Sequence, residues 1–210
     1  MRAFSSRIAQ LVEHRFYIAT VGGSNPSAAT MLDQIISDLM QKVGSSQMTE
    51  DEYRYVAALM GGGKDVLVFG TGHDSRLWRA ANEGGRIVFL ENDPEWITSS
   101  DVVQVSYKTR LGDADTLLAE YAAGIFDGFQ MTLPDEVVGG KWDVIFVDSP
   151  TGYAPSTPGR MQSIYAASIL AGQDTDVLIH DCDRRVEDLY SRAMFSRKIN
   201  QLVKLRHCRK

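Results

Sequence analysis

The chain has 210 residues, of which 44% are hydrophobic and 23% charged, an ordinary composition for a globular protein. This length suits one domain with a sizeable core. The formal net charge of -5 argues against nucleic acid as the main partner, and no apolar run approaches the ~20 residues that a membrane span needs. The two cysteines, Cys182 and Cys208, form neither a disulfide framework nor a zinc site, so we expect free thiols. No feature of the sequence indicates an oligomeric state.

Residues 1–30 differ in character from the rest of the chain. Arginine and serine are frequent there and Glu13 is the only acid, a composition that also occurs in transit peptides. Residues 6–15 and 21–27 resemble the peptide obtained when a transfer-RNA gene is translated by mistake. We therefore expect 1–30 to be a disordered or spurious segment and 31–210 to form the folded domain.

Two amphipathic helices are predicted between residues 31 and 60. Apolar residues recur at helical spacing from Leu32 to Met40, which gives one apolar face. Thr49 and Glu52 stand three apart and form a capping box that starts the second helix. We expect both apolar faces to pack against the core.

Residues 65–75 combine a buried strand, a glycine turn and the start of a helix. Four apolar residues precede Gly70 and Gly72, and a capped helix opens at Asp74. This arrangement favours a nucleotide-type ligand at the carboxyl end of a parallel strand, where glycine lets the ligand approach the backbone. The alternative is a tight turn without a ligand. The third glycine of an NAD-type fingerprint would fall at Ser75, which disfavours a dinucleotide.

An acidic residue follows the second predicted strand. Residues 86–90 are apolar enough for a buried strand, and Glu91 ends it, 21 positions after Gly70. That spacing suits a carboxylate that accepts hydrogen bonds from both ribose hydroxyls of a nucleoside, and the alternative is an exposed loop acid. A third strand is predicted at 102–107. Asp113, which follows it, is expected either to contact the adenine of a bound nucleoside or to cap a helix.

Further strands are predicted at 141–148 and 176–181, with a last edge strand at 202–207. Strands that alternate with helices give an α/β fold, a three-layer sandwich with a mainly parallel sheet. Polar side chains cluster where these strands end, at Asp148, His180 and Asp181. That edge is where open α/β sheets bind ligands.

The glycine turn, the ribose acid and the missing third glycine fit S-adenosylmethionine better than a dinucleotide. Methyl transfer requires alignment of the acceptor oxygen and removal of its proton, for which Asp148, His180 and Asp181 are the candidates. A divalent ion held by Asp148, Asp181 and Asp183 could lower the pKa of a sugar hydroxyl. The alternative for His180 is a buried, hydrogen-bonded core histidine.

Two arginines are candidates for contact with an anionic substrate. Arg160 and Arg184 follow the loops after the fourth and fifth strands, and guanidinium binds carboxylate in a bidentate manner. The alternative for each is a surface arginine.

Several motifs, in this order, resemble the glucuronoxylan 4-O-methyltransferase family of plant cell-wall biosynthesis. They are Leu67–Ser75, Gly84–Trp96, Trp142–Tyr153 with its Asp-Ser-Pro-Thr-Gly-Tyr run, Pro158–Met161, and His180–Arg184 with Glu187-Asp188. The resemblance runs from about Gln47 to His207. It implies a Rossmann-like methyltransferase fold and S-adenosylmethionine as methyl donor.

The resemblance also implies the acceptor, which is the 4-hydroxyl of glucuronic acid residues on a glycan such as xylan, and divalent-metal dependence. By its motifs, Asp148 and the His180-Asp181 pair face the acceptor, and the cofactor is held by Gly70, Gly72, His73, Asp74, Ser75 and Glu91. To these we add Asp113 as a candidate cofactor contact, and Tyr153, Arg160 and Arg184 as candidate contacts to the acceptor. Plant members are Golgi proteins with a membrane anchor, whereas this chain shows no such apolar run. The alternative is a non-catalytic member with a binding or scaffolding role.

Overall fold

The computed structural model describes residues 26–43 and 47–210, which divide into two compact units. The helical unit contains the described residues before Asp65 together with His73–Arg86, and the sheet unit contains Asp65–Gly72 and Ile87–Lys210. Within the described ranges, no helix is both long and apolar enough to cross a membrane. The predictions for residues 1–25 lie outside the described residues.

The helical unit is built from three helices, which are α2 (Pro26–Val43), α3 (Glu50–Met60) and α4 (Ser75–Ala81). The predicted capping box is confirmed, because Thr49 Oγ1 accepts from Glu52 N at 3.3 Å and Glu52 Oε2 accepts from Thr49 N at 2.8 Å. The rings of Tyr53 and Trp78 lie 6.0 Å apart and join α3 to α4. Residues 26–30, expected to be disordered, form the first turn of α2.

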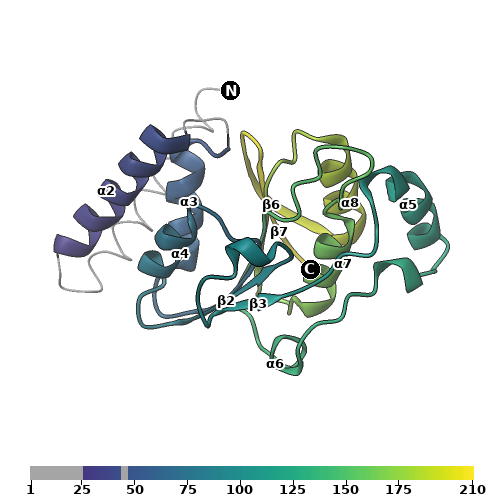
Figure 1. Cartoon of the computed structure of the whole chain (residues 1–210), viewed down its shortest axis with the longest axis horizontal. Coiled ribbons are helices and arrows are strands. Elements are labelled where there is room, and N and C mark those ends of the chain that lie inside the picture. Colours follow the sequence, from purple (N-terminus) through teal and green to yellow (C-terminus); the bar gives the residue numbers. More distant parts are fainter. Residues whose placement is uncertain (1–25, 44–46) are drawn as a thin grey trace. The chain divides into compact units, whose positions relative to one another are not determined.

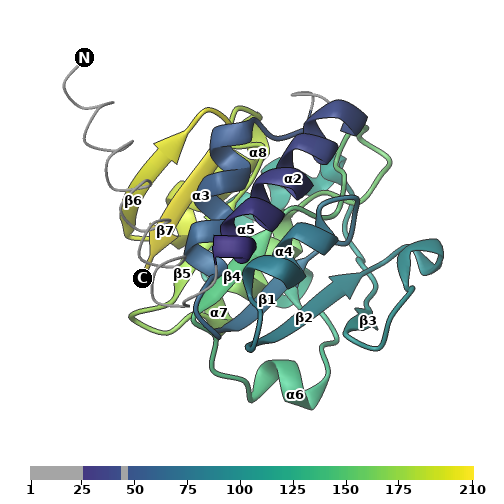
Figure 2. The ribbon, with the colours of Figure 1, turned by 90° about the vertical axis from the view of Figure 1, so that its left-hand side faces the viewer.

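The sheet unit is organised around a seven-stranded sheet. Its strands are β1 (Asp65–Phe69), β2 (Arg86–Glu91), β3 (Val102–Gln104), β4 (Val144–Val147), β5 (Asp176–Ile179), β6 (Arg197–Leu202) and β7 (Leu205–Arg209). They lie in the order β3-β2-β1-β4-β5-β7-β6, which Figure 2 shows from the teal strand β3 to the yellow strand β6. The β1–β4, β4–β5 and β2–β3 pairs are parallel, while β7 runs antiparallel to β5 and β6.

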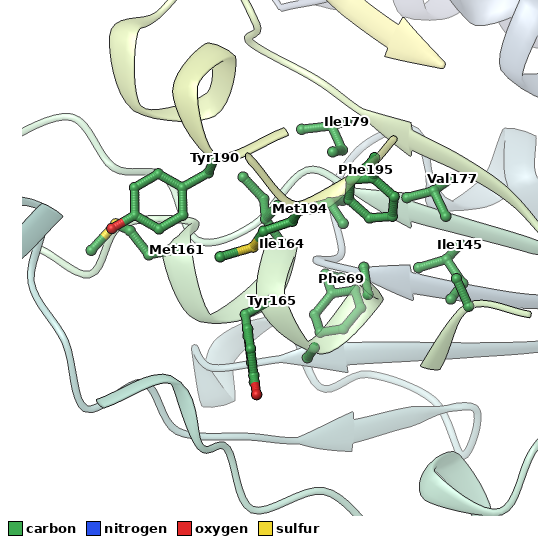
Figure 3. Packing of buried hydrophobic residues seen from close by; sticks show 14 of the residues in the cluster. Phe69, Ile145, Met161, Ile164, Tyr165, Val177, Ile179, Tyr190, Met194 and Phe195 are labelled. Atoms are coloured by element: carbon green, nitrogen blue, oxygen red, sulfur yellow. The ribbon is translucent and has the colours of Figure 1, made fainter. Parts of the chain in front are cut away.

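Three helices of the sheet unit cover one face of the sheet (Figure 1), namely α5 (Ala114–Ala122), α7 (Met161–Leu170) and α8 (Arg185–Met194). The short α6 (Asp135–Val138) and the 3₁₀ turns η2 (Pro94–Trp96), η3 (Leu111–Asp113) and η4 (Asp127–Phe129) lie in the connections. Residues 161–168 of α7 are all buried, as expected for a helix without a polar face. Figure 3 shows Ile164 of α7 beside Met194 of α8, and Phe195 beside Val177 of β5, all in the same core cluster.

The α/β class and the mainly parallel sheet are confirmed, and the strand order with an antiparallel β7 is that of the Rossmann-like methyltransferase fold. The prediction of one edge strand at 202–207 was wrong. Two strands, β6 and β7, form a hairpin there, and the edge strand is β6. Sequence reasoning missed β6 because its residues are exposed or half-buried and polar, so they lack a buried strand's apolar run.

Candidate active site

The turn after β1 contains the first predicted cofactor residues. Gly70 has a φ of 110°, in the left-handed region, and its N–H donates to Leu90 O of β2 at 2.8 Å. A Cβ at Gly70 would lie 2.7 Å from Ser149 Cβ. The protein's own packing between the ends of β1 and β4 therefore requires this glycine, a requirement that the sequence analysis had assigned to the approach of a ligand.

Glu91 ends β2 and holds this turn through its carboxylate. Its Oε2 accepts from Thr71 N at 2.8 Å and from Thr71 Oγ1 at 3.0 Å. Its Oε1 accepts from the N–H groups of Asn92 and Asp93 at 2.7 and 2.8 Å. A carboxylate offers about four acceptor positions, and these contacts use them. A ribose hydroxyl would have to replace Thr71 Oγ1, because it is the one donor of the four on a rotatable side chain.

The remaining predicted cofactor residues are placed differently. His73, Asp74 and Ser75 belong to the helical unit, where Asp74 precedes α4 without a side-chain capping bond. Asp113 is exposed, and its Oδ2 accepts from Arg110 N at 2.8 Å within the η3 turn, while it precedes α5 without a side-chain capping bond. In the sheet unit, the predicted cofactor residues that sit at neighbouring strand ends are those of the Gly70–Gly72 turn and Glu91.

Asp148, His180 and Asp181 come together where β4 and β5 end side by side. His180 Nδ1 lies 2.9 Å from Asp148 Oδ1 and 3.6 Å from Asp181 Oδ1. The parallel β4–β5 pairing places these residues at the same edge of the sheet, as predicted. The side chain of Asp148 is 28% exposed, against 3% for His180 and 8% for Asp181. Asp148 is therefore the member of this cluster that a ligand can reach most readily.

The backbone at Asp181 is unusual. Its φ of 59° lies in the left-handed region, which non-glycine residues rarely adopt, although aspartate tolerates it better than most. The Asp181 carbonyl accepts from Arg184 N at 2.8 Å as the chain turns toward α8. Strained residues persist where the surrounding structure fixes them, and they gather at functional sites.

Arg160 lies in the protein interior, next to this cluster. Arg160 is only 3% exposed. Its Nη2 is 3.1 Å from Asp148 Oδ1 and 2.8 Å from Asp181 Oδ2. Its Nε donates to Pro150 O at 3.0 Å and its Nη1 donates to His180 O at 2.9 Å. The guanidinium predicted to contact the acceptor is thus occupied by the protein itself.

The charges of this cluster stabilise one another. Burial raises the pKa of Asp148, but the neighbouring His180 and Arg160 outweigh it and hold that pKa below its usual range. Burial lowers the pKa of His180, but Asp148 outweighs it and raises that pKa. A carboxylate with a lowered pKa is a weak base, so Asp148 is better suited to accept a hydrogen bond or to bind a cation than to hold a proton.

Two other predicted acceptor residues lie at the surface. Arg184 Nη1 donates to Thr151 O at 2.8 Å and its Nη2 is 3.1 Å from Asp181 Oδ2, while its side chain is 43% exposed. Tyr153 is 77% exposed on the loop after β4. Asp183, predicted as a metal ligand, is exposed and does not join the Asp148 cluster.

The structure also shows buried polar residues to which the sequence had given no role. Glu187, in the first turn of α8, is 1% exposed, and neither carboxylate oxygen has a hydrogen-bond partner within the described ranges. Burial raises its pKa. Ser163 Oγ donates to Ser149 O at 2.8 Å and lies 3.0 Å from Tyr107 Oη, which links α7 to the loops after β3 and β4. Glu187 stood in a matched motif, whereas nothing in the sequence indicated the Ser163 contacts.

The side chains of this cluster are of the kinds that bind a small divalent cation. One ligand atom from each of Asp148, His180 and Asp181 can be chosen so that all lie within 4.8 Å of one another. Two carboxylates and one imidazole suit Mn²⁺ or Mg²⁺. Asp183, which the sequence also predicts as a ligand, does not belong to this group of residues, whereas His180 does.

Comparison with known proteins gives the family. A family model described as IRX15/IRX15L/GXM matches residues 57–126 and 129–207. Glucuronoxylan 4-O-methyltransferase 2 of Arabidopsis thaliana is 33% identical over 90% of this chain and 75% of its own length. From the same plant, glucuronoxylan 4-O-methyltransferase 1 is 39% identical over 61% of this chain and 54% of its own length. Arabinogalactan O-methyltransferase 2 is 37% identical over 68% and 59%, respectively.

Among solved structures, the MycE methyltransferase of mycinamycin biosynthesis, in complex with Mg and SAH, covers 83% of this chain and 48% of its own. That match has a TM-score of 0.47 and 14% identity. The names of the relatives support an O-methyltransferase. Because the family model spans more than half of its length, this chain belongs to the IRX15/IRX15L/GXM family.

Proposed function

We propose that the chain is an S-adenosylmethionine-dependent O-methyltransferase that acts on the 4-hydroxyl of glucuronic acid residues in a glycan such as glucuronoxylan. Relatives named as glucuronoxylan and arabinogalactan O-methyltransferases support the reaction class. The observation that carries the proposal is the partly exposed carboxylate of Asp148, which His180 contacts from inside, in a cluster whose Asp181 also pairs with the exposed guanidinium of Arg184.

In this reaction the acceptor oxygen attacks the methyl carbon in line and the carbon–sulfur bond breaks, with its electron pair going to the sulfur of the leaving S-adenosylhomocysteine. The hydroxyl proton passes to solvent water. Asp148 accepts the hydrogen bond of the acceptor hydroxyl and thereby orients it. His180 Nδ1–H, held against Asp148 Oδ1, fixes the carboxylate in place. In the alternative state in which His180 is deprotonated, Asp148, His180 and Asp181 could hold a divalent cation. Such a cation would supply a Lewis acid that lowers the pKa of the hydroxyl.

Arg184 and Tyr153 are the proposed contacts to the sugar. Arg184 uses two of its nitrogens for Thr151 and Asp181, and its exposed part remains available to a uronate carboxylate. The exposed ring of Tyr153 offers an apolar face with a polar tip, which suits the face of a sugar. For the cofactor we propose, within the sheet unit, the Gly70–Gly72 turn and Glu91 together with Asp113. His73, Asp74 and Ser75, in the helical unit, stay sequence predictions.

The alternative is a non-catalytic member with a binding or scaffolding role. Protein IRREGULAR XYLEM 15 of Arabidopsis thaliana, whose name states no reaction, is 36% identical over 60% of this chain and 47% of its own length. The intact cluster of Asp148, His180 and Asp181 favours the enzyme.

The test begins with calorimetric titration of the full chain with S-adenosylhomocysteine, with and without Mn²⁺. Glucuronoxylan oligosaccharides and S-adenosylmethionine are then supplied, and the methyl ester or ether position is assigned by NMR. We expect cofactor binding and a new 4-O-methyl group. Cofactor binding without transfer to any uronate glycan would favour the scaffold, and the absence of binding would refute the cofactor.

The Asp148→Asn variant tests the site. We expect the affinity for S-adenosylhomocysteine to stay near wild type and the transfer rate to fall on the order of 100-fold, because the amide misplaces the hydroxyl. Asp174→Asn is the matched control, since Asp174 is exposed just before β5, at the opposite end of that strand from His180. A fully active Asp148→Asn protein would exclude Asp148 from the reaction.

A further inference from the structure

We infer that Arg160 is a positioning residue, which holds Asp148 and Asp181 in the arrangement that the acceptor meets and does not itself contact the acceptor. The inference rests on the proposed function for its consequence in catalysis. Its structural part, the fixing of the two carboxylates, stands on the contacts of this chain alone.

One guanidinium joins the loop between β4 and α7 to the end of β5. Arg160 immediately precedes α7, its Nη2 lies between Asp148 and Asp181, and its Nε and Nη1 donate to the carbonyls of Pro150 and His180. The loop after β4, the end of β5 and the start of α7 are therefore tied together by one planar group. Only arginine offers donors in this fixed fork, so lysine could satisfy part of the set but not all of it.

The charges require a cation at this position. Asp148 Oδ1 and Asp181 Oδ2 both lie within 3.1 Å of Arg160 Nη2, so without it the two carboxylates would face each other with less compensation. A buried charge that loses its partner is strongly unfavourable, and the carboxylates would move apart. Since His180 Nδ1 lies on the same Asp148 oxygen, its position would change as well.

The location excludes direct contact with the acceptor in this arrangement. The side chain of Arg160 is 4% exposed, whereas that of Arg184, which shares Asp181 Oδ2 with it, is 43% exposed. A Cβ at the preceding Gly159 would lie 2.6 Å from Met161 Sδ and 3.2 Å from Leu111 Cα, so the backbone there is tightly packed. The two arginines thus divide the work, with Arg160 supporting the carboxylates from inside and Arg184 facing the solvent.

The first test separates positioning from substrate contact by steady-state kinetics with the uronate acceptor. We expect Arg160→Met to lower kcat on the order of 100-fold with little change in KM, since a displacement of about 1 Å has that effect. Arg160→Lys should retain part of the lost kcat. Arg184→Met should raise KM instead. Arg185→Met is the control, because Arg185 forms an exposed pair with Asp115. A rise in KM alone for the Arg160 variants would overturn the inference.

The second test does not depend on turnover. Hydrogen–deuterium exchange of the full chain compares wild type with Arg160→Lys, the variant that keeps the buried charge. We expect faster exchange in peptides that cover residues 149–160 and 180–184, and unchanged exchange in those that cover β1 and β2. Unchanged exchange throughout would overturn the inference, whereas a wild-type protein without transfer activity would refute only the proposed function.

Discussion

Asp176 and Asp181 stand at opposite ends of β5 and are treated differently by the structure. Asp176 is 6% exposed, and its Oδ1 accepts from His207 Nε2 at 2.8 Å and from Arg209 Nε at 2.6 Å, both on β7. Burial raises the pKa of Asp176, but the hydrogen bonds and charges of His207 and Arg209 outweigh it and hold the pKa at about 2. This carboxylate is a structural link between β5 and β7. It lies at the start of β5, at the opposite end of the strand from His180 and Asp181.

The lowered pKa of Asp176 predicts a specific pH dependence of stability. Because the folded protein binds this proton less tightly than the unfolded chain, the ionised carboxylate stabilises the fold above about pH 4 and ceases to do so as pH falls toward about 2. We expect Asp176→Asn to lower the free energy of unfolding by about 1.5–3 kcal/mol at neutral pH. Thermal unfolding between pH 7 and pH 2 checks this.

The difference between Asp176→Asn and wild type should shrink as pH falls, because the wild-type carboxylate is then protonated too. Asp115→Asn is the control, since the Asp115 side chain is 74% exposed in its pair with Arg185. A stability difference that stays constant down to pH 2 would contradict the assignment.

At the scale of the element, the turn after β1 is set by packing as well as by backbone conformation. Gly70 has a φ of 110° and would bring a Cβ to 2.7 Å from Ser149 Cβ, whereas Gly124 has a φ of 78° with nothing within 4 Å of the added atom. We expect Gly124→Ala to cost about 1–2 kcal/mol for the conformation alone. Gly70→Ala should cost about 1–3 kcal/mol more, because the extra methyl is forced into a packed contact.

Urea unfolding of the two alanine variants measures this difference directly. Equal losses in the two proteins would show that Ser149 moves aside at no cost, and the requirement at Gly70 would then be conformational only. A larger loss at Gly70 would support the close contact between the ends of β1 and β4.

Sequence reasoning recovered the elements whose local signals are strong. The apolar runs at Val66–Phe69 and Val144–Val147 gave β1 and β4, and the spacing of Thr49 and Glu52 gave the start of α3. It missed the β6–β7 hairpin because β6 is polar. Pairing with β7 places β6 at the sheet edge, and the residue pattern within β6 does not reveal that pairing. It also assigned to a ligand the glycine that Ser149 requires, since the partner lies 79 positions away from Gly70.

At the scale of the whole molecule, the parallel sheet explains why part of the site could be predicted. Strands that run in one direction bring their carboxyl ends to one edge of the sheet. The meeting of Asp148, His180 and Asp181 can therefore be predicted without knowing how the side chains pack. Which arginine lies inside could not be predicted in this way. Arg160 and Arg184 both follow strand-end loops, and only the packing of the loop before α7 buries the first and leaves the second exposed.

The same sheet holds the main core of its unit, and this predicts where stability is concentrated. Ile145 lies in β4 between its parallel neighbours β1 and β5 and is fully buried, whereas Ile169 in α7 is 62% exposed. The change from isoleucine to alanine removes the same atoms at both positions. We expect Ile145→Ala to lower the free energy of unfolding by about 2–5 kcal/mol, the cost of lost burial plus a cavity. Ile169→Ala should stay within about 0.5 kcal/mol of wild type.

Urea unfolding followed by tryptophan fluorescence and by circular dichroism measures both variants, and agreement of the two signals shows whether one transition describes the chain. A cooperative core around β4 predicts that Ile145→Ala shifts both signals together. If only one signal moved, the two units would unfold separately, and the loss at Ile145 would belong to the sheet unit alone. A loss of stability at Ile169 equal to that at Ile145 would contradict the core assignment. It would show that the cost of removing the same atoms does not depend on burial.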